Sequence, residues 1–364
     1  MEKVKCICSS EDYNLLYRLN DPSGVSKQFY PFVKCSSCGL VYINLRPSDE
    51  ELKNLYDEYY SAMKRPLRGI ESNLIKFFNR IRIYRIFGFK KLCFFSRGTY
   101  HAYTFLTSCQ NLYGEKSRKI LDIGCGDGSF LVHLKEKGWD VFGVETSRNA
   151  VLSARERNRL DIFCGDLKDA NFPSGFFDVL TMWHVLEHIP YPIQLLAEVK
   201  RVMKNGGLLF ISVPDIESIQ AKVCKGKWFH MDPPRHLYQY SPGTLNAILE
   251  RGGFKIMRVS HSSGEYDAFG WFQSILNMLL PEMNILYYWL NGRIKRVDSR
   301  RNSKDFGSYL KKVWAGSIIL ISIIPVSILS ILLTCLCGIF KSGGSLSVWC
   351  TQNGKEDIID SSAD

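Results

Sequence analysis

A chain of 364 residues that is 46% hydrophobic and 23% charged is too apolar to be intrinsically disordered, and it is long enough for two or three packed domains. Twelve cysteines are too few for a disulfide-stapled secreted scaffold, and the polar start, Met1 to Lys5, is not the beginning of an apolar signal core. We therefore expect a globular, enzyme-sized protein in the cytosol whose cysteines are thiols or metal ligands.

The formal net charge of +11 is typical of nucleic-acid binding, but its distribution favours another partner. Residues 64–101 carry ten basic side chains against one acid, and residues 293–312 carry eight against two. Both runs adjoin apolar or amphipathic stretches, which is typical of attraction to anionic lipid. We predict a membrane surface as a partner and expect no nucleic acid.

Four cysteines near the start have the character of metal ligands. Cys35 and Cys38 form a knuckle with a two-residue gap, and Cys6 and Cys8 lie about thirty residues earlier. The one-residue gap of the first pair makes both thiols harder to place on one tetrahedron, so a three-ligand site and reduced thiols without metal remain alternatives. We predict structural Zn²⁺ in a module at residues 1–44, followed by a basic helical linker at 45–117.

Residues 118–263 alternate short apolar runs with amphipathic stretches, which predicts a parallel α/β sheet with helices on both faces. The strands are expected at 120–123, 141–145, 161–164, 177–183 and 208–213, and the helices at 130–137, 148–158 and 193–203.

The turn after the first expected strand is rich in glycine. Asp122 precedes Gly124, Gly126 and Gly128, and bare backbone between a strand and a helix lets a ligand approach closely. The dinucleotide fingerprint needs a sixth-position glycine where Ser129 stands, so the spacing disfavours NAD. A tight turn with no ligand is the alternative.

Two further acids end strands of the same expected sheet. Glu145 closes the second strand, where a carboxylate can accept hydrogen bonds from a ribose diol, and Asp166 closes the third, where it can accept from an adenine amine. Either acid alone would be a solvated turn residue. Because strand ends of a parallel sheet converge on one crevice, together they predict an adenosine pocket.

With these motifs the sequence resembles the class I S-adenosylmethionine-dependent methyltransferases over residues 118–263, including the run from Phe177 through Trp183 to His188 and the later Asn205-Gly206-Gly207. The resemblance implies an α/β, Rossmann-like seven-stranded sheet whose last strand is antiparallel. It also implies a set of cofactor-binding positions. In this set, Asp122, Gly124, Cys125, Gly126 and Gly128 would bind the methionine part, Glu145 the ribose, and Asp166 and Leu167 the adenine. Trp183 is the remaining cofactor-binding position.

The candidates for catalysis follow the fourth strand. His184, Glu187 and His188 resemble a His-x-x-x-Glu-His signature of methyltransferases of the ubiquinone-biosynthesis type. His188 is the first candidate for a general base or a substrate-orienting group, and a structural histidine that Glu187 orients is the alternative.

A second cluster, residues 228–238, supplies His236, which resembles the His-Leu-x-x-Phe/Tyr-Ser element of the same subfamily. His230 and Arg235 could meet a polar or anionic acceptor there. A rigid loop without a direct role is the alternative.

The C-terminal region contains 28 residues without a charge, 313–340. The sixth strand is expected at 254–260 and the seventh at 345–351, so the apolar insertion at 264–342 has to return to the sheet before the last strand and tail at 343–364. Because Pro325 divides the segment into arms too short to cross a bilayer, we predict a shallow membrane hairpin, which residues 269–290 would support as an amphipathic contact. A buried helical pair, a dimer interface and a single span are alternatives.

Together these features predict a methyltransferase at the cytoplasmic face of a membrane, acting on a small or lipid-linked acceptor. The predicted reaction is O-methylation of a saccharide or cell-envelope precursor. The N-terminal residues also resemble zinc-knuckle methyltransferases associated with sugar or envelope biosynthesis. The alternatives are a zinc-bearing scaffold with an inactive methyltransferase-like domain and a nucleic-acid methyltransferase. A homodimer is compatible with the sequence.

Overall fold

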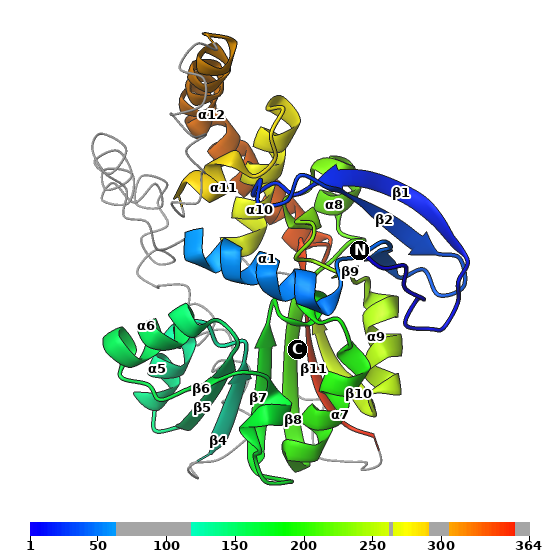
Figure 1. Cartoon of the computed structure of the whole chain (residues 1–364). Helices are drawn as coiled ribbons and strands as arrows, with labels where there is room; N and C mark the ends of the chain where they lie inside the picture. The colour runs from blue at the N-terminus through cyan, green and yellow to red at the C-terminus, as the bar shows by residue number, and fades with distance from the viewer. Residues whose placement is uncertain (63–117, 262–264, 291–305, 354–364) are drawn as a thin grey trace. The chain divides into compact units, whose positions relative to one another are not determined.

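The computed structural model describes residues 1–62, 118–261, 265–290 and 306–353 (Figure 1). The chain divides into two compact units, each described by itself below. The first unit comprises Met1–Ile75, Pro214–Thr244 and Ser260–Leu346, and the second comprises Lys76–Val213, Leu245–Val259 and Ser347–Asp364. The basic run at 64–101, and most of the one at 293–312, lie outside the described residues.

The second unit is built on a seven-stranded sheet with the strand order β10-β11-β8-β7-β4-β5-β6. Strand β4 pairs in parallel with β5 on one side and with β7 on the other. Strand β5 pairs in parallel with β6, and β7 pairs in parallel with β8. This is the α/β sheet predicted from the sequence. The strands are β4 (Lys119–Ile123), β5 (Asp140–Glu145), β6 (Phe163–Cys164), β7 (Phe177–Trp183), β8 (Met203–Pro214), β10 (Phe254–Ser260) and β11 (Ser345–Gln352).

Most of the expected elements lie within two residues of their predicted ends. Strand β8 begins five residues earlier than expected, because Phe177 pairs with Met203 while Val179 pairs with Leu208, so Lys204–Gly207 bulges out of the ladder. The helices of this unit are α5 (Ser129–Lys135), α6 (Arg148–Asn158), α7 (Pro192–Val202) and α9 (Pro242–Arg251). Figure 1 shows α5 and α6 beside β4, β5 and β6.

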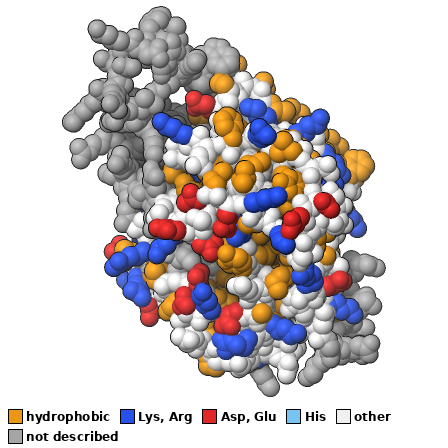
Figure 2. Space-filling model, turned by 45° about the vertical axis from the view of Figure 1, so that its right-hand side comes forward, with side chains coloured by type: hydrophobic (Ala, Val, Ile, Leu, Met, Phe, Trp, Pro, Cys, Tyr) orange, Lys and Arg blue, Asp and Glu red, His pale blue; other side chains and the backbone are white. Residues whose placement is uncertain are grey.

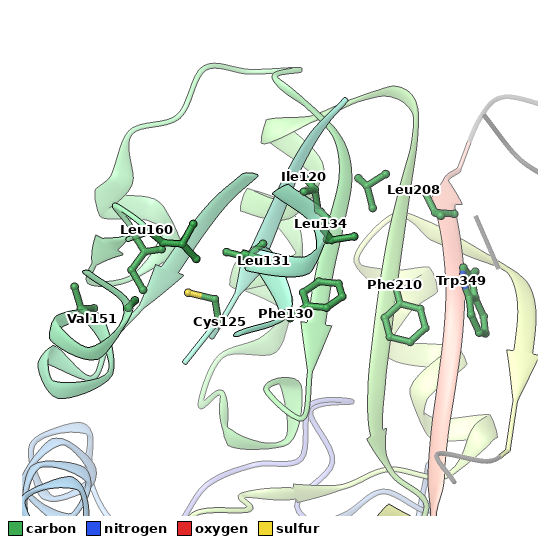
Figure 3. Packing of buried hydrophobic residues seen from close by; sticks show 13 residues of the cluster. Ile120, Cys125, Phe130, Leu131, Leu134, Val151, Leu160, Leu208, Phe210 and Trp349 are labelled. Carbon is green, nitrogen blue, oxygen red and sulfur yellow. The ribbon is translucent and has the colours of Figure 1, made fainter. Parts of the chain in front are cut away.

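The core of the second unit lies between α5, α6 and the sheet (Figure 3). Phe130 packs edge-on against Trp183 at 5.7 Å between ring centroids, and Phe210 packs on Trp349 at 4.8 Å. Trp349 belongs to β11, so the last strand contributes to this core. The other labelled members of the cluster are Ile120, Cys125, Leu131, Leu134, Val151, Leu160 and Leu208.

The prediction that the last strand follows the apolar segment is confirmed. Strand β11 lies between β10 and β8, not at a sheet edge. Val348 and Cys350 are buried, and the hydroxyls of Ser347 and Ser212 are hydrogen-bonded at 2.9 Å. The chain therefore returns to the sheet after residue 340.

The first unit contains a four-stranded sheet with the order β1-β2-β3-β9. Its neighbouring strands are antiparallel, and β9 joins residues near 238 to the N-terminal module. One hydrophobic cluster connects this sheet with the helical part of the unit through Phe32, Trp228, Trp271 and Cys337. The elements are β1 (Tyr13–Asn20), β2 (Phe29–Cys35), β3 (Val41–Ile43), β9 (Tyr238–Gln239), α1 (Asp49–Ala62), α8 (Ile219–Cys224), α10 (Glu265–Leu279), α11 (Ile285–Leu290) and α12 (Phe306–Ile339).

The predicted hairpin at Pro325 is wrong. Helix α12 runs unbroken from Phe306 to Ile339 with Pro325 inside it. Proline in a helix interior costs about 3 kcal/mol because one backbone hydrogen bond is lost. Ile323 and Val326, on either side of the proline, both pack into the cluster formed with α10 and α11, and these contacts hold the two halves in one helix.

Candidate active site and metal site

The glycine loop forms the tight turn between β4 and α5 that the sequence predicts. The N–H of Gly124 donates to the carbonyl of Val144 at 2.8 Å, which ties the loop to the end of β5. A Cβ on Gly124 would come within 2.6 Å of Val185, whereas no atom lies within 4 Å of the corresponding position on Gly126. Gly126 has a φ of +58°, so its backbone faces open space in a conformation that favours glycine.

Glu145 connects this loop to the end of β5. One carboxylate oxygen accepts from the N–H of Gly126 at 2.9 Å, and the other accepts from the N–H of Ser147 at 2.7 Å. Burial raises the pKa of Glu145, and the two backbone donors partly offset that rise. A carboxylate held in this way keeps lone pairs free for the hydroxyls of a ribose.

Asp122 is the second buried acid beside the loop. The hydroxyl of Thr181 on β7 donates to its carboxylate at 2.6 Å. Burial raises the pKa of Asp122 to about 7, the hydrogen bond from Thr181 opposes that rise, and the charge of Glu145 adds to it. Two buried carboxylates close to one glycine loop suit a cationic ligand.

The other predicted cofactor residues lie just after strand β6 or in the core of the second unit. Asp166 is exposed just before a short 3-10 helix, Leu167–Ala170, whose first residue, Leu167, is buried. Cys125 packs in the core next to Gly143, and burial raises the pKa of its thiol, as expected for a packing role. The ring of Trp183 packs against Phe210, so its main contacts are with the core.

We expect Glu145→Ala to weaken S-adenosylmethionine binding by about 1.5–3 kcal/mol, because it removes acceptors from the ribose and from the Gly126 N–H. Glu145→Gln, which keeps one acceptor oxygen, is the matched control and should lose less. Calorimetric titration of the cofactor measures both. Unchanged affinity in a Glu145→Ala, Asp166→Ala double variant would refute the assignment of the pocket.

Cofactor affinity should also depend on Asp122 through pH. Because its folded pKa of about 7 exceeds its ordinary value of 3.8, the folded protein holds a proton that the unfolded chain has lost between these values. The stability contribution of Asp122 therefore falls as pH rises through that window. A bound cation favours the ionised form, so affinity should rise from pH 6 to pH 8. Titrations with Asp122→Asn should show weaker binding and a flatter pH profile; an identical profile would contradict this role.

The histidines after β7 lie in two environments. His184 lies 3.3 Å from the carboxylate of Glu187, which is fully buried in the short 3-10 helix Leu186–His188. His188 ends that helix and is partly exposed. The structure thus places a buried acid and two histidines at the carboxyl end of β7. Asp122 and Glu145 lie at the same ends of β4 and β5.

His236 belongs to the first unit, where its ring is fixed. Nδ1 lies 2.7 Å from the carbonyl oxygen of His230. A carbonyl only accepts, so Nδ1 carries a proton, and when the ring is neutral its lone pair lies on Nε2. Gln239 donates to the same carbonyl at 2.8 Å. His236 therefore has the tautomer that a base at Nε2 requires.

Arg235 is not placed to receive an anionic acceptor, contrary to the expectation from the sequence. Its guanidinium is buried and donates to the carboxylate of Asp232 and to the hydroxyl of Tyr288. Burial acts to raise the pKa of Asp232, but the charge of Arg235 outweighs it and lowers that pKa. Residues 228–238 here are mostly buried, as the rigid-loop alternative anticipates.

The four N-terminal cysteines come together. The sulfurs of Cys6 and Cys38 lie 3.4 Å apart and those of Cys8 and Cys35 lie 3.6 Å apart, and all four lie within 4.8 Å of one another. None of them is in a disulfide. Sulfurs bound tetrahedrally to one zinc at about 2.3 Å would be about 3.8 Å apart. The cluster can hold a metal ion.

The thiol of Cys35 has the electrostatics of a ligand. Burial acts to raise its pKa, but the backbone N–H groups of Cys38 and Ser37 outweigh it and, with the neighbouring thiols, lower the pKa to about 6. Tyr42 lies close to these sulfurs, and its hydroxyl has no hydrogen-bond partner in the described part of the chain. Sequence reasoning missed Tyr42 and Thr181, because neither strand position carries a motif.

Comparison with known proteins agrees with the geometry. Residues 100–259 match a methyltransferase domain family. A ubiquinone biosynthesis O-methyltransferase of Glaesserella parasuis is 35% identical over 105 residues, which cover 26% of this chain and 44% of that protein. A probable S-adenosylmethionine-dependent methyltransferase of Mycolicibacterium smegmatis is 28% identical over 157 residues, covering 42% of this chain and 59% of the relative. The chain thus spans about half the length of these relatives.

A solved S-adenosylmethionine-dependent methyltransferase from Archaeoglobus fulgidus is 19% identical, with a TM-score of 0.40, over 69% of this chain and 94% of that one. From the matched family and the relatives, the chain contains a class I S-adenosylmethionine-dependent methyltransferase domain with distant similarity to ubiquinone-biosynthesis O-methyltransferases.

Proposed function

We propose that this protein transfers a methyl group from S-adenosylmethionine to a small or lipid-linked acceptor. The observation that carries the proposal is the pair of buried acids, Asp122 and Glu145, beside the open backbone of Gly126. Their carboxylates would hold the positively charged and hydroxyl-bearing parts of the cofactor, and Asp166 would accept from the adenine amine.

When bound, the cofactor supplies a sulfonium methyl that is open to in-line attack. The protein has to align the acceptor with that methyl and to remove a proton from a hydroxyl acceptor. His188, at the carboxyl end of β7, is the proposed base, and His236, whose Nδ1 is hydrogen-bonded to the carbonyl of His230, is the second candidate. Glu187 and His184 would position the segment that carries His188.

The proposed reaction is O-methylation of a saccharide or another cell-envelope precursor. An oxygen acceptor is supported by the name of the relative from Glaesserella parasuis, an O-methyltransferase. Nucleic-acid methylation is less well supported, because the face in Figure 2 shows Lys and Arg side chains interspersed with Asp and Glu. Intact acids at the cofactor positions disfavour an inactive scaffold.

We also propose that the cysteine cluster binds one structural Zn²⁺. Four thiolates without carboxylate or histidine are a typical structural zinc site, closed to substrate. Cys35 and Cys38 form the turn after β2, where the N–H of Gly39 donates to the carbonyl of Cys35. The metal would tie this turn to the residues that precede β1.

Mass spectrometry tests the reaction. The full-length protein is incubated with cofactor that carries a deuterated methyl group and with extracts of envelope precursors and lipids. A labelled product that Glu145→Ala forms more slowly supports the proposal. Tight cofactor binding with no labelled product from any extract would favour the inactive scaffold. Label in nucleic acid added to the reaction would favour a nucleic-acid methyltransferase.

A further inference from the structure

Helix α12 exposes an apolar face. From Ile321 onward, the side chains that face away from the protein are aliphatic or aromatic with the exception of one cysteine and a glycine, and Ile321 and Ile339 are 77% and 74% exposed. The other exposed members are Ile324, Pro325, Ile328, Leu329, Leu332, Cys335, Leu336 and Phe340. The segment Ile321–Ile339 is long and apolar enough to cross a membrane.

The buried face of the same helix is the more polar one. Ser327 and Ser330 are buried, and the hydroxyl of Ser330 donates to the carbonyl of Val326 within the helix. Small side chains here allow close packing of α12 on α10. A helix on the surface of a water-soluble protein has the opposite arrangement, with its apolar side inward. The exposed face of α12 is therefore matched to an apolar environment.

The width of the exposed face favours lipid over a second copy of the chain. At 3.6 residues per turn, the exposed side chains span an arc of about 160° when Gly338 is left aside. A two-stranded coiled-coil seam uses the narrower stripe of a and d positions. In the sequence, Lys311 and Lys312 precede the uncharged segment and Lys341 follows it, and basic residues next to an apolar segment are typical of attraction to anionic lipid.

Packing of the opposite face indicates that the helix lies on the membrane and does not cross it. Ile323 and Val326 pack against Phe272 and Leu276 of α10. Helix α10 also carries buried amides, among them Asn277, which donates to the carbonyl of Lys227 at 3.0 Å. A span along α12 would draw this polar packing into the hydrocarbon, at high cost.

We infer that the exposed face of α12, from Ile321 to Phe340, binds the surface of an anionic lipid bilayer, with the helix axis parallel to the membrane and its aliphatic side chains among the acyl chains. The inference adds a defined contact surface and orientation to the membrane association predicted from the sequence. It does not depend on methyl transfer.

Vesicle co-sedimentation tests this surface with the full-length protein and liposomes of phosphatidylcholine with or without phosphatidylglycerol, an anionic lipid that attracts basic residues. We expect binding that increases with the anionic lipid and falls at least tenfold in Ile328→Gln, Leu332→Gln. The matched control is Met257→Gln, Val259→Gln, which replaces exposed apolar residues of β10. Circular dichroism and the midpoint of thermal unfolding verify that each variant is folded.

Two outcomes would overturn the inference. If light scattering shows a dimer that Ile328→Gln, Leu332→Gln converts to a monomer while vesicle binding is unchanged, a second copy covers this face. If a C-terminal epitope is protected from protease in sealed vesicles while an N-terminal one is digested, the helix spans the bilayer. Equal loss of binding in the control variant would remove the specificity for α12.

Discussion

Removal of the proposed zinc ion from the cysteine cluster is expected to unfold the edge of the N-terminal sheet. Zinc contributes about 10–16 kcal/mol of binding free energy in small metal-dependent domains, and here the four ligands join the segment before β1 to the turn after β2. Cys35→Ser, Cys38→Ser should therefore contain no zinc. Amide exchange in β1 and β2 should accelerate, while the strands of the seven-stranded sheet keep their protection.

The matched control is Cys335→Ser, since Cys335, like Cys38, is an exposed thiol but lies on α12. It should retain one zinc per chain by elemental analysis. Cys6→Ser separates a three-ligand from a four-ligand site, because only the first tolerates its loss. Protein purified under reducing conditions without chelators that contains no zinc would refute the site.

The expected strands at 177–183 and 254–260 match β7 and β10 without error. Runs of apolar residues that end at turns define such strands locally. The Gly-rich loop and Glu145 could be predicted because each lies at the end of such a run. The position of β11 after the apolar segment followed from the resemblance, because the related fold needs a seventh strand after residue 260.

Other features depend on contacts between distant residues and could not be predicted. The guanidinium of Arg235 donates to the hydroxyl of Tyr288, which is 53 residues away along the chain, so the sequence could not show this hydrogen bond. Thr181 meets Asp122 only because β7 and β4 are neighbours. Pro325 is a helix breaker by local rules, but packing of Ile323 and Val326 on α10 overrides that preference.

The largest effect on turnover is expected from His188. If it is the general base, His188→Ala should lower turnover by about 10²- to 10⁴-fold with an acceptor identified by mass spectrometry, while cofactor affinity stays near that of the wild type. The matched control is His133→Ala on α5, a histidine 3.6 Å from the carboxylate of Glu136 and outside the proposed site. It should be fully active.

The pH profile separates a base from a merely structural histidine. A base must be deprotonated, so wild-type turnover at saturating cofactor should fall at acidic pH. In His188→Ala this acidic limb should disappear, and added imidazole should restore part of the rate. A structural role would lower turnover at every pH without rescue. A fully active His188→Ala with an impaired His236→Ala would assign the proton to Nε2 of His236, whose tautomer the carbonyl of His230 already fixes. Activity in both variants would mean that the acceptor needs no histidine base.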